Sequence, residues 1–536
     1  MEEAMSKRSG RTRHGKRDTS GQKAPAGTRG PASFSARLFE ESRLLPDLIC
    51  AGVLILAILL VYHRVFRYFF SQDDFTSLWI AREGPATFWR ILSSFVYFGA
   101  GRFLFGLHPA AFHAASLAAH LACGMLVFLV ARALSAGRTA ALFSACVFAT
   151  HPALYAAVYS ISSAGEILSC AFVLAAALFM LRAARPERPQ GLLLTAVLFA
   201  ASLLSKETAL LFPILVFFIY WQRGFGLRRA VLPFAVMAAV AAAYGYLFYR
   251  ANIFGVRGAS SAGQPYVLTF GPLLLTSLQT YFKWALDVVQ PLKGESMNVL
   301  DQKASVWLLG GAALFGLLLL GRADRKKTAY CILWFMLSLL PVIPLTSHPY
   351  HYYLYLPLAG LCPAVGLLLS RRLGRARLDA PVSAALLVLF VFNSSIAVSR
   401  IERATVVNSA RRKDPVFDRA IVAGNLINDL RRVEMPAGTR LVLVSPLTAI
   451  SEGRLTEHPY LVMGGPYWDT NLRAAVADGT GIRLFFPQVD SVAFARDTSS
   501  GYAGFTAVDY TWDGHVRAVE KLPGADSPQP SAPQSR

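Results

Sequence analysis

Long apolar stretches separated by short polar or basic connections dominate the first 400 residues of the chain. The first stretch runs from about residue 46 to about residue 66. About 20 helical residues cross the hydrocarbon core of a bilayer, so each stretch is close to the length of a transmembrane helix. Ten more follow at about 107–131, 138–160, 165–182, 190–206, 208–222, 230–250, 304–320, 329–346, 354–370 and 380–398. The pattern predicts an all-α polytopic membrane protein with about eleven transmembrane helices.

One further apolar segment, from Pro272 to Pro291, carries a polar stripe. Gln279, Lys283 and Asp287 recur at every fourth residue and therefore share one face of a helix. Such a stripe is typical of an interfacial or re-entrant element. Counting the segment as a span would also place the basic loop that begins at Arg322 on the outer side. We therefore expect this helix to lie on the outer surface.

The hydrophobic pattern changes at about residue 400, and residues 401–522 are expected to form a soluble outer domain. The short apolar runs 440–444 and 482–486 predict strands. The runs 505–510 and 515–519 predict a hairpin, because an Asp-Gly pair between them supplies the positive φ angles of a tight turn. The domain is therefore expected to be a small α/β or mostly β fold.

Composition agrees with a membrane protein. Of the 536 residues, 54% are hydrophobic and 16% are charged, which excludes an ordinary soluble protein. The net charge of +21 could indicate nucleic-acid binding, but the excess Lys and Arg lies in short loops and in the N-terminal tail. We expect residues 1–40 to be a disordered basic cytoplasmic tail, residues 41–400 the transmembrane domain and residues 523–536 a second disordered tail.

The basic connections also predict the orientation of the chain. The loops 322–327 and 371–377 are strongly basic, and Lys and Arg are concentrated in cytoplasmic loops. With eleven spans the N-terminus is then cytoplasmic and the C-terminal domain extracytoplasmic.

Two adjacent carboxylates, Asp73 and Asp74, follow the first apolar stretch. An ionised side chain within the hydrocarbon costs about 2.5–3.5 kcal/mol on insertion scales, so acids beside a span normally face a water-filled cavity or a partner. One interpretation is a solvated loop that ends the helix. The interpretation that we favour is a reaction centre at the membrane surface, where a divalent metal ion is a candidate cofactor held by the two acids.

Further polar residues gather at the predicted outer ends of the spans. Each has a structural alternative: Lys206 can extend to the headgroups or pair with Glu207 or another acid, a His-Pro pair can form a turn and a tyrosine-rich run can be an interfacial aromatic belt. Their coincidence on one face, opposite the basic loops, favours a common site. The candidates for substrate or phosphate binding are Arg102, His151, Glu166, Lys206, Glu207, His348, His351 and Tyr353.

Five short motifs occur in an order that resembles a known family. They are Asp73-Asp74, Gly101 to Pro109, Phe148 to Pro152, Leu204 to Thr208 and Tyr353 to Pro357. This order resembles GT-C-type integral-membrane glycosyltransferases, and most of all the bacterial relatives of the tetratricopeptide-bearing protein O-mannosyltransferases. The resemblance covers residues of about 60 to 400. The helical repeats of those relatives are missing here.

The resemblance implies a mannosyltransferase-like enzyme of the bacterial inner membrane. It would move a sugar from a polyprenyl-phosphate donor to an acceptor hydroxyl of a protein, lipid or glycan on the outer face. Asp73 or Asp74 would take the proton of the acceptor, with Asp73 the first choice, and the other acid would orient the acceptor or bind metal. Arg102 and Lys206 would balance the charge of the leaving phosphate.

The sequence departs from the family pattern at three positions. Leu154 and Ala156 replace a second His and a Glu after the His-Pro pair, and Ala164 replaces an Arg ahead of Glu166. Two alternatives from other classes remain: a polytopic transporter or lipid flippase, and an inactive GT-C-like scaffold. A transporter favours charged groups near mid-membrane, whereas the charged residues here lie near the outer ends.

Overall fold

The computed structural model describes residues 41–84, 88–251, 254–256, 266–289, 300–302, 305–320, 324–373, 379–405, 412–444, 467–495, 501–511 and 513–523. The predicted tail of residues 1–40, and all of the predicted C-terminal tail except Pro523, lie outside these ranges. Residues 1–49 and 50–536 separate into two units. Apart from residues 41–49 at the start of the first helix, the features described below belong to the second unit.

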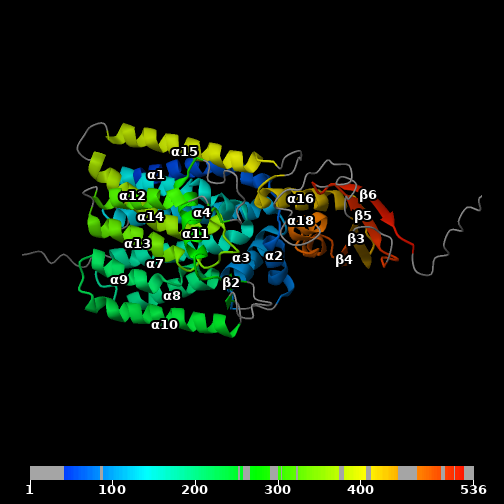
Figure 1. Ribbon diagram of the computed structural model, residues 1–536, viewed down its shortest axis with the longest axis horizontal. Helices are drawn as coiled ribbons and strands as arrows, with labels where there is room; N and C mark the ends of the chain where they lie inside the picture. The colour runs from blue at the N-terminus through cyan, green and yellow to red at the C-terminus, as the bar shows by residue number, and fades with distance from the viewer. Residues whose placement is uncertain are drawn as a thin grey trace, which may run out of the picture. The chain divides into compact units, whose positions relative to one another are not determined.

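Eleven helices coincide with the eleven predicted apolar stretches, and Figure 1 shows that many of them have nearly parallel axes. Their bounds are α1 (Glu41–Tyr62), α4 (Pro109–Ala133), α5 (Arg138–Ala149), α7 (Ala164–Arg182), α8 (Pro189–Ser205), α9 (Phe212–Gln222), α10 (Arg228–Arg250), α12 (Ser305–Leu320), α13 (Arg325–Leu339), α14 (Tyr355–Leu373) and α15 (Asp379–Arg403). The predicted all-α multi-pass architecture is confirmed.

The number of full-length spans is smaller than the number of apolar helices. By length and composition, six helices of the described residues can cross a membrane, and a seventh span results if the bent pair Arg138–Ala149 and Pro152–Tyr159 is counted as one. The two halves of that pair meet at 46°. The helices α8, α9 and α12 are apolar but shorter. The positions of the helices therefore match the prediction more closely than the count of spans does.

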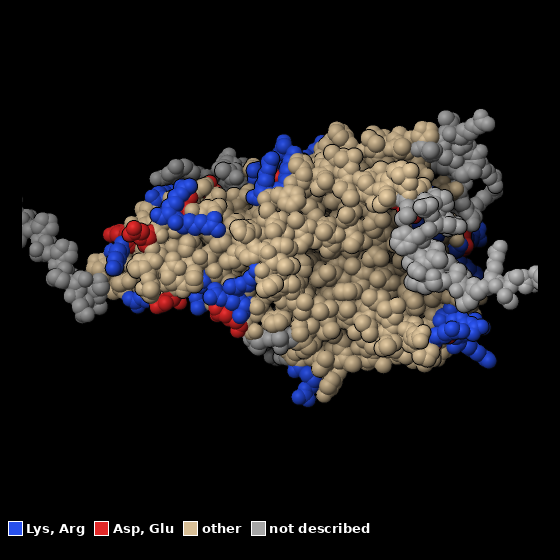
Figure 2. Space-filling view, turned by 180° about the vertical axis from the view of Figure 1, so that it is seen from behind, with Lys and Arg blue, Asp and Glu red and all other residues tan. Residues whose placement is uncertain are grey.

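The apolar surface of the helices agrees with a lipid environment. Figure 2 shows a broad area without Lys, Arg, Asp or Glu on the face in view, with charged residues on either side of it. Large apolar side chains are exposed on the outward faces of several spans, among them Leu56 of α1 (59%) and Val388 of α15 (67%). In water such a surface would be strongly unfavourable, whereas in a bilayer it needs no further partner.

The helix α11 (Leu273–Leu286) is not among the helices that can cross a membrane, as predicted, but the alternative of an exposed interfacial helix on the outer surface is wrong. Its residues Tyr281 and Trp284 are fully buried. The predicted polar stripe faces the protein interior: the Nζ atom of Lys283 lies 2.6 Å from the Asp301 carboxylate, and the Gln279 side chain donates a hydrogen bond to the Asp301 carbonyl. The stripe marks a buried ion pair and not a water-facing side.

Short helices connect the spans at the end of the bundle that precedes the C-terminal domain. Each is too short to cross a bilayer, and five of the eight contribute residues to the lining of the polar cavity described below. They are α2 (Asp73–Glu83), the π-helix η2 (Ile91–Val96), α3 (Tyr97–Phe105), η3 (Pro152–Leu154), α6 (Tyr155–Tyr159), η4 (Ile161–Ser163), η5 (Glu207–Ala209) and η6 (His351–Leu354).

The C-terminal domain is an α/β fold, as one of the two predicted alternatives stated. Its sheet has the strand order β4-β3-β5-β6, with β3 parallel to both of its neighbours and β5 antiparallel to β6. Its elements are α16 (Pro415–Leu430), β3 (Thr439–Val444), α18 (Tyr467–Ala475), α19 (Thr480–Phe485), β4 (Val489–Ala495), β5 (Thr506–Tyr510) and β6 (Val516–Lys521).

The predictions for this domain are partly confirmed. The strand at 440–444 and the hairpin correspond to β3 and to β5 with β6, and Gly514 adopts a φ of +89° in the turn. The predicted strand at 482–486 is wrong, because this run forms α19 after Gly479, which caps the helix with a φ of +85°. The strand β4 and the short parallel pair β1 (Phe254–Val256) and β2 (Tyr266–Leu268) escaped the sequence pattern.

A single apolar cluster joins the C-terminal domain to the segment that follows α1. Phe70 and Phe75 pack in it with Leu426 of α16 and Ile482 of α19. A Cβ atom on Gly481 would lie 2.9 Å from the Phe75 ring, so the two segments approach as closely as a glycine allows. The position of the acid pair is therefore fixed by both the helical bundle and the C-terminal domain.

Candidate functional site

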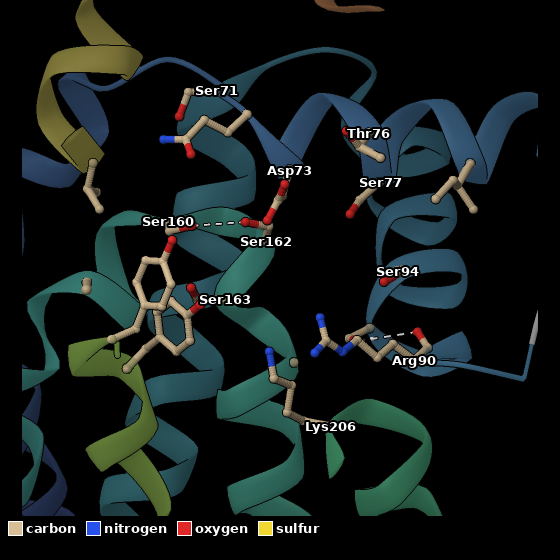
Figure 3. Close-up of a pocket in the computed structure, with 18 of the residues that line it drawn as sticks. Ser71, Asp73, Thr76, Ser77, Arg90, Ser94, Ser160, Ser162, Ser163 and Lys206 are labelled. Atoms are coloured by element: carbon tan, nitrogen blue, oxygen red, sulfur yellow. Dashed lines mark hydrogen bonds between the residues drawn. The ribbon is translucent and has the colours of Figure 1, made fainter. Parts of the chain in front are cut away.

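A cavity of about 370 Å³ lies among the short connecting helices. Its lining is rich in hydroxyl groups: seven serines and Thr76 contribute to it. Asp73 is the one acidic residue among the described residues that line it, whereas Arg90, Lys206 and Arg419 supply positive charge. Figure 3 shows Asp73 on one side of the cavity and Lys206 and Arg90 on the opposite side. The serines are Ser71, Ser77, Ser93, Ser94, Ser160, Ser162 and Ser163.

The two adjacent acids have different environments. Asp73 begins α2, is exposed and lines the cavity. Asp74 is only 3% exposed, and its two oxygens accept hydrogen bonds from the backbone N–H groups of Ser71 at 3.0 Å and Ser162 at 2.6 Å. Asp74 thus ties the start of α2 to η4, and of the two carboxylates only Asp73 faces the cavity.

The stability of the protein should depend on the ionisation of Asp74. Burial raises the pKa of its carboxyl from 3.8 to about 7, although the hydrogen bonds from Ser71 and Ser162 oppose this shift. The folded state therefore holds the proton more tightly than the unfolded chain does, so this group favours folding at low pH and ceases to do so as pH rises from about 4 to about 7.

The variant Asp74→Asn cannot lose a proton in this range, and it places an amide nitrogen against one of two N–H donors. We expect the wild-type protein to melt at a higher temperature than this variant, with the largest difference below pH 4 and a smaller one above pH 7. Melting curves in detergent across this pH range measure the difference. A difference that grows with rising pH would contradict the assignment.

The cation Lys206 is held beside the cavity by a buried acid. Its Nζ atom lies 3.4 Å from Oε1 of Glu166, and the two side chains are 9% and 1% exposed. The Thr208 hydroxyl donates to the other carboxylate oxygen of Glu166. A lysine that only extends to the lipid headgroups would lack such a partner, so this alternative for Lys206 is contradicted.

The second cation, Arg90, was not predicted from the sequence. Its guanidinium makes two hydrogen bonds to the Glu207 carboxylate, one of them from Nε at 3.1 Å, and it donates to the Tyr266 hydroxyl at 2.7 Å. Burial alone would raise the pKa of Glu207, but Arg90 and Lys206 outweigh burial and hold it at about 2. Glu207 is therefore ionised at neutral pH and balances the charge of Arg90.

Aromatic rings enclose the two cations. Lys206 Nζ lies 5.4 Å from the ring centre of Tyr352 and 5.8 Å from that of Tyr353, and Arg90 lies 4.8 Å above Trp89. Such faces stabilise positive charge by cation–π attraction. Burial, assisted by Lys206 and Arg90, lowers the pKa of the neighbouring His348 to about 4. His348 is thus neutral at pH 7 and can donate one hydrogen bond and accept another.

The backbone around the cavity contains rare conformations. Of the five described non-glycine residues with positive φ, Gln72 (+50°) and Arg90 (+54°) both line the cavity. Arg90 also precedes the π-helix η2. Non-glycine residues with positive φ cost about 1–3 kcal/mol, and both they and π-helical turns concentrate at functional sites. Two residues of the cavity wall therefore have strained backbone conformations that the surrounding structure maintains.

The remaining predicted residues lie outside the lining. Arg102 of α3 does not reach the cavity. His151 is buried, donates from Nε2 to the Ala285 carbonyl and accepts at Nδ1 from the Ala153 N–H, which indicates a structural role in the turn. His351 is fully buried and stacks on Trp284 at 3.8 Å.

The structure therefore gathers Asp73, Lys206 and His348 at the cavity wall, with Tyr353, Glu166 and Glu207 directly behind the two cations. Of the lining residues that the sequence analysis missed, Arg90 stands beside a tryptophan at the start of an apolar run, which is a signal of an interfacial cation. Arg419 follows no pattern of this kind.

The described residues do not fit a metal site of the predicted kind. None of them form a group of three or more His, Cys, Asp or Glu side chains that could hold an ion. Both oxygens of Asp74 already accept backbone hydrogen bonds, which leaves Asp73 as the single carboxylate of the pair directed to the cavity. Divalent ions such as Mg²⁺ and Ca²⁺ require several oxygen ligands.

The central segment of the chain is similar to a known protein family. Residues 92–249 match the family described as dolichyl-phosphate-mannose-protein mannosyltransferase. This segment contains Lys206 and Glu166 of the site, while Asp73 precedes it. The predicted resemblance to GT-C-type integral-membrane glycosyltransferases is confirmed over this part of the chain.

One relative is similar over a limited region of the chain. The chain is 33% identical over 142 residues to the protein O-mannosyl-transferase Tmtc1 of Drosophila melanogaster, which is 26% of this chain and 16% of that protein. The match thus covers less than a fifth of the length of that relative.

Two solved structures show low similarity. ArnT from Cupriavidus metallidurans bound to undecaprenyl phosphate is 13% identical, with a TM-score of 0.47 and coverage of 87% of this chain and 93% of that one. AglB from Archaeoglobus fulgidus, in complex with an inhibitory peptide and a dolichol-phosphate, is 10% identical, with a TM-score of 0.43 and coverage of 75% and 62%.

Proposed function

We propose that this multi-pass membrane protein is a glycosyltransferase that moves a sugar from a polyprenyl-phosphate carrier to an acceptor hydroxyl. The observation that carries the proposal is one cavity with a carboxylate, Asp73, opposite two fixed cations, Lys206 and Arg90. The family match over residues 92–249 supports this class of reaction and favours mannose as the sugar.

The reaction breaks the bond between the sugar C1 atom and a phosphate oxygen and forms a bond between C1 and the acceptor oxygen. The acceptor proton passes to Asp73, which is exposed to the cavity and therefore accessible to a substrate. The electron pair of the broken bond stays on the carrier phosphate. Lys206 and Arg90 stabilise the negative charge that develops there, because both are positioned before the reaction begins.

Glu166 and Glu207 have a supporting role in this proposal. Each pairs with one of the two cations from behind the cavity wall, where neither acid belongs to the lining. They hold the two cations in place in the absence of substrate, since a buried unpaired charge would be costly. The sequence analysis expected these two acids to bind the substrate or its phosphate, whereas in this proposal they contact only the cations.

The hydroxyl-rich part of the lining suits a sugar. Ser94 and Ser163 can exchange hydrogen bonds with sugar hydroxyls, and Trp89 can pack against the ring. No step requires a metal ion, in agreement with the poor fit of the acid pair to metal coordination. The acceptor can belong to a protein, a lipid or a glycan.

The proposed location is a bacterial inner membrane, with the N-terminus in the cytoplasm and the C-terminal domain outside. Arg132 and Arg182 lie at the ends of α4 and α7 that are remote from the cavity, at the start of basic connections, which supports this orientation. A cavity at the outer end would meet the phosphate of a carrier whose chain stays in the bilayer.

Binding of the carrier alone tests the proposal. Undecaprenyl phosphate should raise the melting temperature of the purified protein, because a ligand that binds only the folded state stabilises it. Undecaprenol, which has the same chain without the phosphate, is the control and should have a smaller effect. Equal shifts with both compounds would contradict a phosphate site at Lys206 and Arg90.

A further inference from the structure

The residue before Asp73 has a backbone conformation that needs support. Gln72 adopts φ +50° and ψ −121°, a region that side chains with a Cβ atom rarely occupy. Such a conformation costs about 1–3 kcal/mol and persists only where surrounding contacts enforce it. Since Gln72 is the N-cap of α2, its conformation sets the direction in which Asp73 leaves the turn.

The contacts that hold Gln72 come from the C-terminal domain. Nη1 of Arg419, in α16, donates to Oε1 of Gln72 at 2.6 Å. The backbone N–H of Gln72 donates to the carbonyl of Ala475, the last residue of α18, at 3.0 Å. Both bonds join residues that are more than 340 positions apart in the sequence.

Arg419 is itself fixed. Its Nε atom donates to Oδ1 of Asn471 at 3.4 Å, and the Asn471 amide donates to the buried Asp418 carboxylate at 3.0 Å. A continuous series of hydrogen bonds therefore connects Asn471 of α18 to Arg419, and Arg419 to Gln72. Arg419 also lines the cavity, so it lies on the same side as the acid that it would position.

We propose that Arg419 is a positioning residue, which orients Asp73 through Gln72 and makes the C-terminal domain a structural part of the reaction site. The inference rests on the proposed function for the role of Asp73. Asp74 fixes the turn toward η4, and Arg419 with Ala475 fixes it toward the C-terminal domain. Removing either support should leave Asp73 present but less well oriented.

Kinetic measurements test this role. Arg419→Met should lower kcat for sugar transfer about 10- to 100-fold, since small misplacements of a reacting group can cost about 100-fold, and should change KM for the donor by less than about 2-fold. Arg419→Lys keeps a donor within reach of Gln72 and should recover most of the rate. Gln72→Met removes the acceptor and should resemble Arg419→Met, and the double variant should be no slower than the slower single variant.

The matched control is Arg432→Met. Arg432 follows α16, has a side chain that is 84% exposed and pairs with Asp429 at 3.8 Å, so its loss should leave kcat unchanged. Additive losses in the double variant, or a loss confined to KM for the acceptor, would overturn the positioning role. In the second case Arg419 would bind the acceptor directly.

Hydrogen exchange supplies a readout that does not require activity. The N–H groups of Gln72 and Phe75 are bonded to the carbonyls of Ala475 and Gln72, respectively. In Arg419→Met both should exchange faster than in the wild-type protein and in Arg432→Met. Unchanged exchange would overturn the inference even if the enzyme is active, whereas faster exchange in a protein that transfers no sugar would contradict only the proposed function.

Discussion

Replacing Asp73 by asparagine should lower kcat for sugar transfer by about 10²–10⁴-fold, the usual contribution of a positioned general base. The amide has the shape of the acid and lacks its basicity. Because Asp73 is exposed and lines the cavity, the substitution leaves the packing of α2 intact, and the melting temperature should change little. Steady-state transfer rates and melting curves of the same preparation measure both quantities.

The neighbouring acid provides the comparison. Asp74→Asn should also lose activity, but together with stability, because Asp74 accepts two backbone hydrogen bonds within a buried turn. The two variants are thus distinguished by the relation between rate and melting temperature. If Asp73→Asn transferred sugar within a few-fold of the wild-type rate, Asp73 would not be the base.

Replacing Lys206 by methionine should have two large effects. Transfer should slow by about 10²–10³-fold, as expected when one fixed stabiliser of developing negative charge is removed. Folding should be destabilised by about 3–5 kcal/mol, the usual cost of breaking a buried ion pair, because Glu166 is 1% exposed and would lose its cationic partner. Melting temperature and donor turnover are the measurements.

A double variant separates the two effects. Lys206→Met combined with Glu166→Gln removes both charges of the pair, so most of the lost stability should return. Turnover should remain slow, because the cation that faces the cavity is still absent. Recovery of turnover together with stability would show that Lys206 serves only to pair with Glu166.

The arrangement of helices was largely predictable from sequence, because a bilayer demands apolar stretches of defined length. Whether a polar stripe faces water or the protein interior was not predictable. The spacing of Gln279 and Lys283 correctly indicates one helical face, but their partner Asp301 lies 18 residues beyond Lys283, and without it the stripe appears to face water. Likewise, the short run 482–486 has no period long enough to distinguish a strand from a helix.

The site was predictable only in part. The pair Asp73 and Asp74 is evident from sequence, yet the choice between them depends on the N–H group of Ser162, 88 residues away from Asp74. Arg90 and Arg419 gain their significance from partners 117 and 347 residues distant, which no local pattern connects. Contacts between residues so far apart in the sequence become visible only once the fold is known.

Release of labelled mannose from its carrier tests the central claim most directly. The purified protein is incubated with polyprenyl-phosphate mannose labelled in the sugar, and a membrane lysate supplies the acceptor. A parallel incubation contains a nucleoside-diphosphate mannose with the same label. The account predicts that label leaves the polyprenyl carrier, that Asp73→Asn abolishes most of this transfer and that the nucleotide sugar is not consumed. Retention of all label on the polyprenyl carrier by the folded wild-type protein, or equal use of the nucleotide sugar, would contradict it.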